Sequence, residues 1–125
     1  MQLDLGDLES VVNFAKEFRS KYNRLDVLLC NGGIMNLPTR KTTPQGFEMQ
    51  FGVNYLGHYT LTRCLMSSLK ATEGSRVVHV ASNAHRWGKK HMHWEDLQMK
   101  EDYHPFEAYA QSKYSTVLFS IQLAE

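Results

Sequence analysis

Several features that mark particular classes of protein are scarce or missing in this sequence. Only two cysteines occur, Cys30 and Cys64, and they lack the spacing of metal ligands. This favours a reduced compartment, although two thiols can still pair in an oxidising one. The longest apolar runs, such as Val27–Cys30, are far too short to span a bilayer. The amino terminus, Met1–Asp4, lacks the basic and then apolar pattern of a secretory signal, so we expect no transmembrane segment in this chain.

An excess of one charge, internal repeats and biased tracts are missing as well. The 14 basic and 13 acidic residues give a formal net charge of +1, which provides no reason to expect nucleic acid or an anionic membrane as a partner. No repeat or low-complexity tract is present. With 125 residues, 42% of them hydrophobic and 22% charged, the composition is that of one ordinary globular domain.

Two short apolar segments have the composition of buried strands. Residues 25–30 (LDVLLC) are stopped by Asn31-Gly32-Gly33, and residues 75–82 (SRVVHVAS) end at Ser82. A continuous apolar strand predicts burial on both faces, as in a parallel sheet.

Helical periodicity precedes the first strand and closes the chain. Asp7 is a typical N-cap, and apolar residues recur at helical spacing over residues 8–22. Pro105 opens the last helix. Before it, residues 83–104 are rich in histidine, tryptophan and charge, and we expect a loop there.

A third helix is predicted between the two strands. Thr43-Pro44, a capping hydroxyl followed by proline, is a good helix start, and the apolar stripe continues to Lys70. Gly52 and Gly57 flank Asn54 and predict a kink at that point.

Helices and strands therefore alternate along the whole chain. Such alternation predicts an α/β fold, with a layered parallel sheet and right-handed crossovers. Ligands bind such sheets at the carboxyl ends of the strands. Asn31, Gly32 and Ser82 follow the predicted strands directly and are the first candidate site residues.

Tyr109 and Lys113 form a candidate pair for proton transfer in the last helix. Residues four apart lie on the same helix face, so the ammonium of Lys113 can stand near the phenol of Tyr109. A neighbouring cation stabilises an ionised phenol, which would help Tyr109 to exchange a proton at neutral pH. Roughly 0.4 such pairs are expected by chance in a chain of this composition, so the pair carries little weight alone.

Several short motifs, taken together and in order, resemble those of one known family. They are Asp4-Leu5, CNGG at 30–33, VNYLGHYTLT at 53–62, RVVHVASNAH at 76–85 and AYAQSK at 108–113. They resemble the short-chain dehydrogenase/reductases, and within them the retinol-dehydrogenase-like branch. The resemblance implies a fragment of a Rossmann-type doubly wound parallel sheet in three αβα layers, with residues 1–125 forming a partial NAD(P)-binding domain.

The resemblance also implies a reaction and roles for four residues. The family interconverts alcohols and carbonyls by hydride transfer with NAD or NADP, here on a lipophilic substrate such as a retinoid or steroid. Tyr109 would be the acid/base and Lys113 its electrostatic partner. Ser82 would donate to the substrate oxygen, and the Asn54 backbone would hold a water that relays the proton from Lys113.

The cofactor contacts implied by the resemblance lie at strand ends and on the last helix. The carboxylate of Asp4 would meet the adenine amino group, and glycine would let the backbone approach the ribose closely. The full implied set is Asp4, Leu5, Asn31, Gly32, Gly33, Tyr109 and Lys113.

The sequence also departs from the family pattern. No glycine-rich turn of the T-G-x-x-x-G-x-G kind occurs, and that turn normally holds the pyrophosphate. Cys30 and Gly32 replace the asparagine and alanine that are usual in their motif. We expect a domain that lacks the glycine-rich first βαβ unit and the C-terminal substrate segment, as in a truncated product or an incomplete gene model. Such a chain would keep the catalytic residues without binding the cofactor tightly.

Plainer interpretations exist for every candidate. Individually, each is more easily read as a packed aromatic, a solvated charge, a strand-end residue, a kink or a turn, and only their combination favours a site. The residues concerned are Asp4, Gly32, Gly33, Asn54, Ser82, Tyr109 and Lys113.

Two further readings concern function and metals. The alternative function is a non-catalytic interaction module, because in the family the helices that correspond to residues 44–70 and 105–124 form the dimer interface. It would form a homodimer or pair with a full-length relative.

No G-x-S-x-G elbow supports a hydrolase. His85, His91, His93 and His104 lack a completing ligand pattern, so we expect no metal. The family implies a cytoplasmic or membrane-associated protein.

Overall fold

The structure, a computed structural model, describes residues 1–125. It contains six helical segments and two strands joined by turns. In chain order they are α1 (Leu8–Lys21), β1 (Val27–Cys30), α2 (Met49–Phe51), the π-helix η1 (Gly52–Gly57), α3 (His58–Ala71), β2 (Arg76–His79), α4 (His85–Lys90) and α5 (Pro105–Ala124). Helical segments thus precede, separate and follow the two strands, as predicted.

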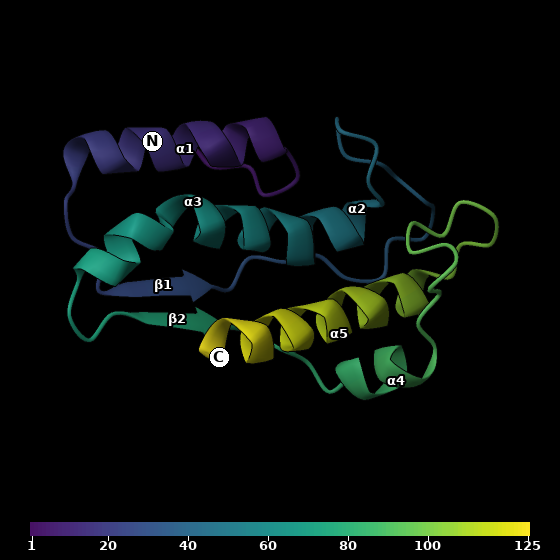
Figure 1. Cartoon of the computed structure of the whole chain (residues 1–125). Coiled ribbons are helices and arrows are strands. Elements are labelled where there is room, and N and C mark those ends of the chain that lie inside the picture. The colour runs from purple at the N-terminus through teal and green to yellow at the C-terminus, as the bar shows by residue number, and fades with distance from the viewer.

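The two strands form a parallel pair. Val27 is opposite Arg76 and Cys30 is opposite His79, so the two carboxyl ends meet at one edge of the sheet. Figure 1 shows β1 and β2 side by side, with α1 and α3 stacked along one side of them. The predicted α/β class with a parallel sheet is confirmed, although both strands are shorter than the sequence predicts.

Burial of the sheet on both faces was predicted and is wrong for these residues. Leu28 and Cys30 are buried, whereas Val27 and Leu29 are 55% and 59% exposed. The reason is that α1 and α3 supply apolar side chains to one face only. That core consists of Val11, Ala15, Leu28, Cys30, Leu61, Leu65 and Leu69.

The first helix begins where the sequence predicts. The Asp7 carboxylate accepts a hydrogen bond from the backbone N–H of Glu9 (3.0 Å), which satisfies one of the free donors of the first turn. The same carboxylate accepts from the side-chain amide of Gln45 (2.8 Å). These two bonds lower the pKa of Asp7 below its ordinary value.

The predicted helix start at Thr43-Pro44 is wrong. These residues form a turn in which Gly46 has a φ of +86°, a left-handed conformation that ends any helical path. The helix begins instead at Met49, where the Glu48 carboxylate accepts from the N–H groups of Gln50 (2.9 Å) and Phe51 (2.7 Å). The carboxylate cap replaces the hydroxyl cap that the sequence indicated.

The predicted kink around Asn54 takes the form of the π-helix η1. At its end Gly57 lies directly against the N-terminal segment, because a Cβ there would stand 2.4 Å from the Leu5 carbonyl oxygen. A π-helix widens one turn and is often found at functional sites. It places Asn54 on the side that faces α5.

The predicted loop at 83–104 contains a short helix, α4. Figure 1 shows α4 beside the first half of α5. Gly88 permits this contact, because a Cβ there would lie 2.2 Å from the Ala110 carbonyl oxygen. The sequence did not predict this helix, because glycine has a low helix propensity and the residues around it are basic. None of the helices combines the length and apolarity that crossing a membrane requires.

Candidate active site

Asn54, in η1, is the centre of a buried hydrogen-bond network that joins the segment after β1 to α5. Its Oδ1 accepts from the Ile34 N–H (2.8 Å), and its Nδ2 donates to the Ile34 carbonyl (2.9 Å). The same Nδ2 donates to the hydroxyl of Ser112 (3.0 Å). Asn54 therefore joins the segment after β1 to α5, and its side chain is almost fully satisfied.

The backbone carbonyl of Asn54, predicted to hold a relay water, is also engaged. It accepts a hydrogen bond from the Thr116 hydroxyl (3.3 Å). A carbonyl oxygen has two lone pairs, so a second donor can still bind there. The role of this carbonyl as a water site stays a prediction.

Tyr109 and Lys113 lie together on α5, as their spacing predicts. The Nζ of Lys113 is 5.8 Å from the centre of the Tyr109 ring and donates to the Val80 carbonyl (3.0 Å). Lys113 is buried, with 7% of its surface exposed, which is rare for a lysine without a specific partner. The bond to Val80 fixes the ammonium at the carboxyl end of β2.

These residues share one small pocket with the segment that follows β1. Its volume is about 200 Å³, and it is lined by Asn31, Gly33, Ile34, Met35, Tyr109 and Lys113. A Cβ on Gly33 would stand 3.0 Å from Asn54 Oδ1 and 3.9 Å from Lys113 Nζ. Glycine at this position therefore keeps the floor of the pocket open beside the ammonium.

Ser82 follows β2 but does not join this network. Its hydroxyl accepts from the Ala84 N–H (3.2 Å), and its carbonyl accepts from the His85 N–H (3.0 Å). No hydrogen bond connects its hydroxyl to Tyr109 or Lys113, and it does not line the pocket. The structure thus brings Asn31, Gly33, Tyr109 and Lys113 to one cavity and leaves Ser82 in a local turn outside its lining.

Asp4 and Leu5 lie in the segment that precedes α1. The Asp4 carboxylate accepts from the Gly6 N–H (2.8 Å) in a tight turn. Leu5 packs against Gly32, where a Cβ would meet the Leu5 side chain at 2.8 Å. Neither residue lines the pocket.

His58, the first residue of α3, is a site neighbour that the sequence analysis did not single out. Its Nε2 lies 2.7 Å from the Gly32 carbonyl oxygen, and the residue is 5% exposed. Burial lowers the pKa of His58, and the nearby charge of Lys113 lowers it further, while the bond to Gly32 opposes both. The available signal was spacing, since His58 follows Asn54 by four residues on a helix.

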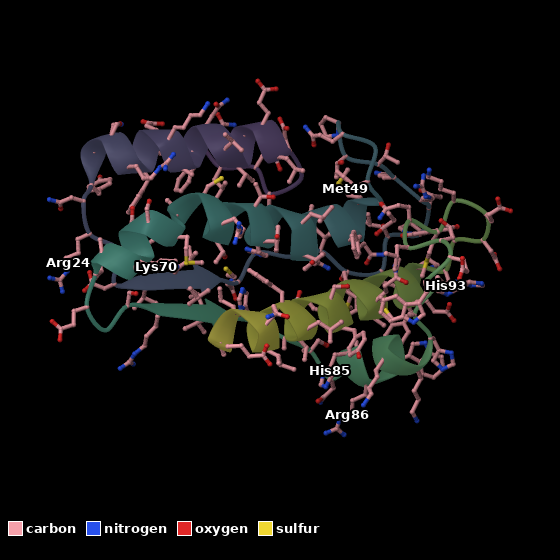
Figure 2. The ribbon with its side chains drawn as sticks, viewed as in Figure 1. Arg24, Met49, Lys70, His85, Arg86 and His93 are labelled. Atoms are coloured by element: carbon pink, nitrogen blue, oxygen red, sulfur yellow. The ribbon has the colours of Figure 1, made fainter.

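A larger pocket of about 570 Å³ lies elsewhere. It is lined by ten residues of α3, β2 and the end of α5, among them Lys70, His79 and Ser120. Figure 2 shows Lys70 at one end of the molecule and His93 at the other, near the start of α5. Tyr109 lies in the second turn of α5, so this larger pocket contains none of the predicted site residues.

His79, on β2, has only one of its two ring nitrogens satisfied. Its Nδ1 lies 2.9 Å from the Ser120 hydroxyl, whereas its buried Nε2 has no partner. Burial lowers its pKa, and the proximity of His58 adds to the effect.

Comparison with known proteins agrees with this arrangement. Residues 1–94 match the family model of the short chain dehydrogenases. The chain belongs to the short-chain dehydrogenase family. It is 46% identical over 125 residues to retinol dehydrogenase 13 of Mus musculus and 44% identical over 123 residues to retinol dehydrogenase 11 of Homo sapiens. These matches take in 98% of this chain, so they include the part of α5 beyond the family model, but only 36% and 38% of the two relatives.

Solved structures show the same fold. An uncharacterised protein from Mycobacterium paratuberculosis superposes with a TM-score of 0.84 at 40% identity, covering 98% of this chain and 42% of that one. A short-chain dehydrogenase from Escherichia coli CFT073 gives a TM-score of 0.69 at 25% identity, with 98% and 49% covered. The chain thus spans little more than a third of the curated relatives' length and less than half of these solved chains.

Proposed function

We propose that this short-chain dehydrogenase chain carries the acid/base part of an NAD(P)-dependent oxidoreductase that interconverts an alcohol and a carbonyl. The observation that carries the proposal is the pocket shared by Tyr109, Lys113, Asn31 and Gly33. A phenol beside a buried ammonium at the carboxyl ends of two parallel strands is suited to exchange a proton with a bound oxygen.

Tyr109 donates a proton to the substrate oxygen in the reductive direction and accepts it in the oxidative one. The charge of Lys113 stabilises the phenolate that remains after donation. Because Lys113 is held by the Val80 carbonyl, it needs no reorganisation during the reaction.

Ser82 supplies a second hydrogen bond to the same oxygen. Its hydroxyl oxygen already accepts from the Ala84 N–H, so its own hydrogen stays free to donate. In this role Ser82 stabilises the charge that grows on the substrate oxygen.

The residues present fit a nicotinamide cofactor at this pocket. The missing Cβ of Gly33 leaves room beside Lys113, where Asn31 and Gly33 would hold the ribose end of NAD or NADP. When bound, the cofactor supplies or accepts the hydride. Asp4 and Leu5 are assigned to its adenine end on the family pattern.

The substrate class is a lipophilic alcohol or carbonyl, such as a retinoid or steroid. Ile34 and Met35 provide an apolar wall to the pocket, and Met35 is 63% exposed at its mouth. The names of two relatives, retinol dehydrogenases 13 and 11, agree with that class. The alternative prediction, a dimerisation module, gains no support from any comparison.

Consumption of reduced nicotinamide tests this function. The purified protein is mixed with NADH or NADPH and a lipophilic aldehyde such as retinal, and the absorbance of the reduced nicotinamide is followed. We expect turnover that Tyr109→Phe abolishes and that Tyr114→Phe, on the same helix but outside the pocket, leaves intact. Turnover that survives Tyr109→Phe, or no turnover with either cofactor, would contradict the proposal.

A further inference from the structure

His58 forms a direct link between α3 and the turn that follows β1. The Gly32 oxygen can only accept, so at 2.7 Å the Nε2 of His58 must be the protonated, donating nitrogen. The other ring nitrogen, Nδ1, is buried and has no partner. A proton there would be an unsatisfied buried donor, so the ring is neutral with its hydrogen on Nε2.

Nothing else in the turn fixes the peptide between Gly32 and Gly33. Two successive glycines have the widest backbone freedom of any pair, and both residues are exposed. The next two peptides are held separately, since the side chain of Asn54 binds both the N–H and the carbonyl of Ile34. His58 is thus the one side chain that restrains the Gly32 carbonyl.

Restraining that carbonyl also sets the direction of an amide hydrogen. All peptide bonds of the chain are trans, so the carbonyl of Gly32 and the N–H of Gly33 point in opposite directions. Because the carbonyl points to His58, the Gly33 N–H points away from α3. Gly33 lines the pocket with Tyr109 and Lys113, and its N–H makes no hydrogen bond within the chain.

We propose that His58 is a positioning residue that clamps the Gly32 carbonyl and thereby aims the Gly33 N–H into the pocket as a donor to an oxygen of the bound cofactor. This inference rests on the proposed function, because it assigns a donor to the cofactor of that same pocket. A merely structural histidine would stabilise α3 without affecting what the pocket binds. The two roles separate in the experiments that follow.

Two substitutions at His58 distinguish a hydrogen-bond donor to the Gly32 carbonyl from a side chain that only fills space. His58→Gln places an N–H₂ group at a reach similar to that of Nε2, whereas His58→Leu fills the space without a donor. A matched control is His79→Leu, which removes the other buried histidine with an unpartnered nitrogen but lies on β2, in the larger pocket. Thermal unfolding of all variants reports stability separately.

The binding readout is a fluorescence titration of the purified protein with NADPH and NADH. We expect His58→Leu to weaken binding about tenfold, the size of effect that follows from one misdirected hydrogen bond. We expect His58→Gln to stay within about twofold of the parent protein, and His79→Leu likewise. Parent-like binding by His58→Leu, or equal loss in a folded His58→Gln, would overturn the clamp.

A second readout does not depend on cofactor. NMR of the ¹⁵N-labelled protein assigns the ring proton of His58 and the amide resonance of Gly33. The clamp requires the proton on Nε2, a shifted Gly33 amide in His58→Leu and its return in His58→Gln. The clamp is refuted if the proton lies on Nδ1 or if the Gly33 amide resonance is the same in the parent protein and in both variants. If the parent protein binds neither nucleotide while the NMR criteria hold, the proposed function fails and the clamp stands.

Discussion

The two halves of the candidate site are held in different ways. On one side, hydrogen bonds connect distant parts of the chain: Asn54 reaches Ser112 across 58 positions and Ile34 across 20, and Lys113 reaches Val80 across 33. On the other side, Ser82 bonds only to residues two and three positions away. The first half exists only when η1, α5 and the ends of β1 and β2 have assembled, whereas the second can form as a local turn.

This difference separates two kinds of functional residue. Changes around Asn54 should damage the fold and the pocket together, because the same bonds serve both. Changes at Ser82 should alter chemistry while the fold survives. Each prediction below either tests that separation or measures how large it is.

Asn54→Leu should give the largest loss of stability. It leaves the N–H and carbonyl of Ile34 without partners and removes the bond to Ser112, for a cost of about 4 kcal/mol in the free energy of unfolding. Urea unfolding followed by circular dichroism measures it. Asn83→Leu, on the exposed Ser82 side, is the control and should change stability by less than about 0.5 kcal/mol. Equal losses of stability in Asn54→Leu and Asn83→Leu would contradict the difference between the two halves of the site.

Acid should weaken the fold through two histidines, the buried His58 beside the site and the half-buried His79 on β2. Burial lowers the pKa of both His58 and His79 from the ordinary 6.5, so the unfolded chain takes up protons first as the pH falls through that value. Stability therefore falls toward acid, by at most about 1.4 kcal/mol per pH unit for each histidine. Urea unfolding at a series of pH values should show a flatter profile in the His58→Gln/His79→Gln double variant. An unchanged slope would mean that neither histidine is responsible.

Much of this architecture could be predicted from the sequence, but not the assembled site. Asp7 capping α1, the two strands and the irregularity at Asn54 follow local rules of spacing and capping, and they are confirmed. Thr43-Pro44 failed because the same dipeptide suits a turn, and only the left-handed Gly46 decides between them. His58 was overlooked because its partner is a backbone carbonyl 26 residues away, and its spacing of four residues from Asn54 does not reveal that contact.

Gly33→Ala should have a smaller effect, confined to the pocket. Its Cβ would press at 3.0 Å on the Oδ1 of Asn54, whose side-chain amide is held by three hydrogen bonds, so we expect a loss of about 1 kcal/mol. Gly32→Ala is the matched control, because its Cβ would meet only the mobile end of Leu5. Thermal unfolding compares them, and a more damaging change at Gly32 would show that Asn54 is not the rigid element.

Ser82→Ala should have the smallest effect on stability, below about 1 kcal/mol, because it removes one local hydrogen bond. Turnover of a lipophilic aldehyde should nevertheless fall by roughly a hundredfold, as expected for loss of a donor to the developing oxyanion. The two numbers come from one preparation, by calorimetry and by nicotinamide absorbance. A large loss of stability with unchanged turnover would show that Ser82 has a structural role and not a catalytic one.

The most direct test of the central claim is an NMR titration of the protein with NADPH and NADH. The claim is that the segment after β1 and the first half of α5 form one pocket for the nicotinamide end of the cofactor. We predict that the resonances of Asn31, Gly33, Tyr109 and Lys113 shift together. Shifts confined to Lys70, His79 and Ser120, around the larger pocket at the other end of α5, would contradict it.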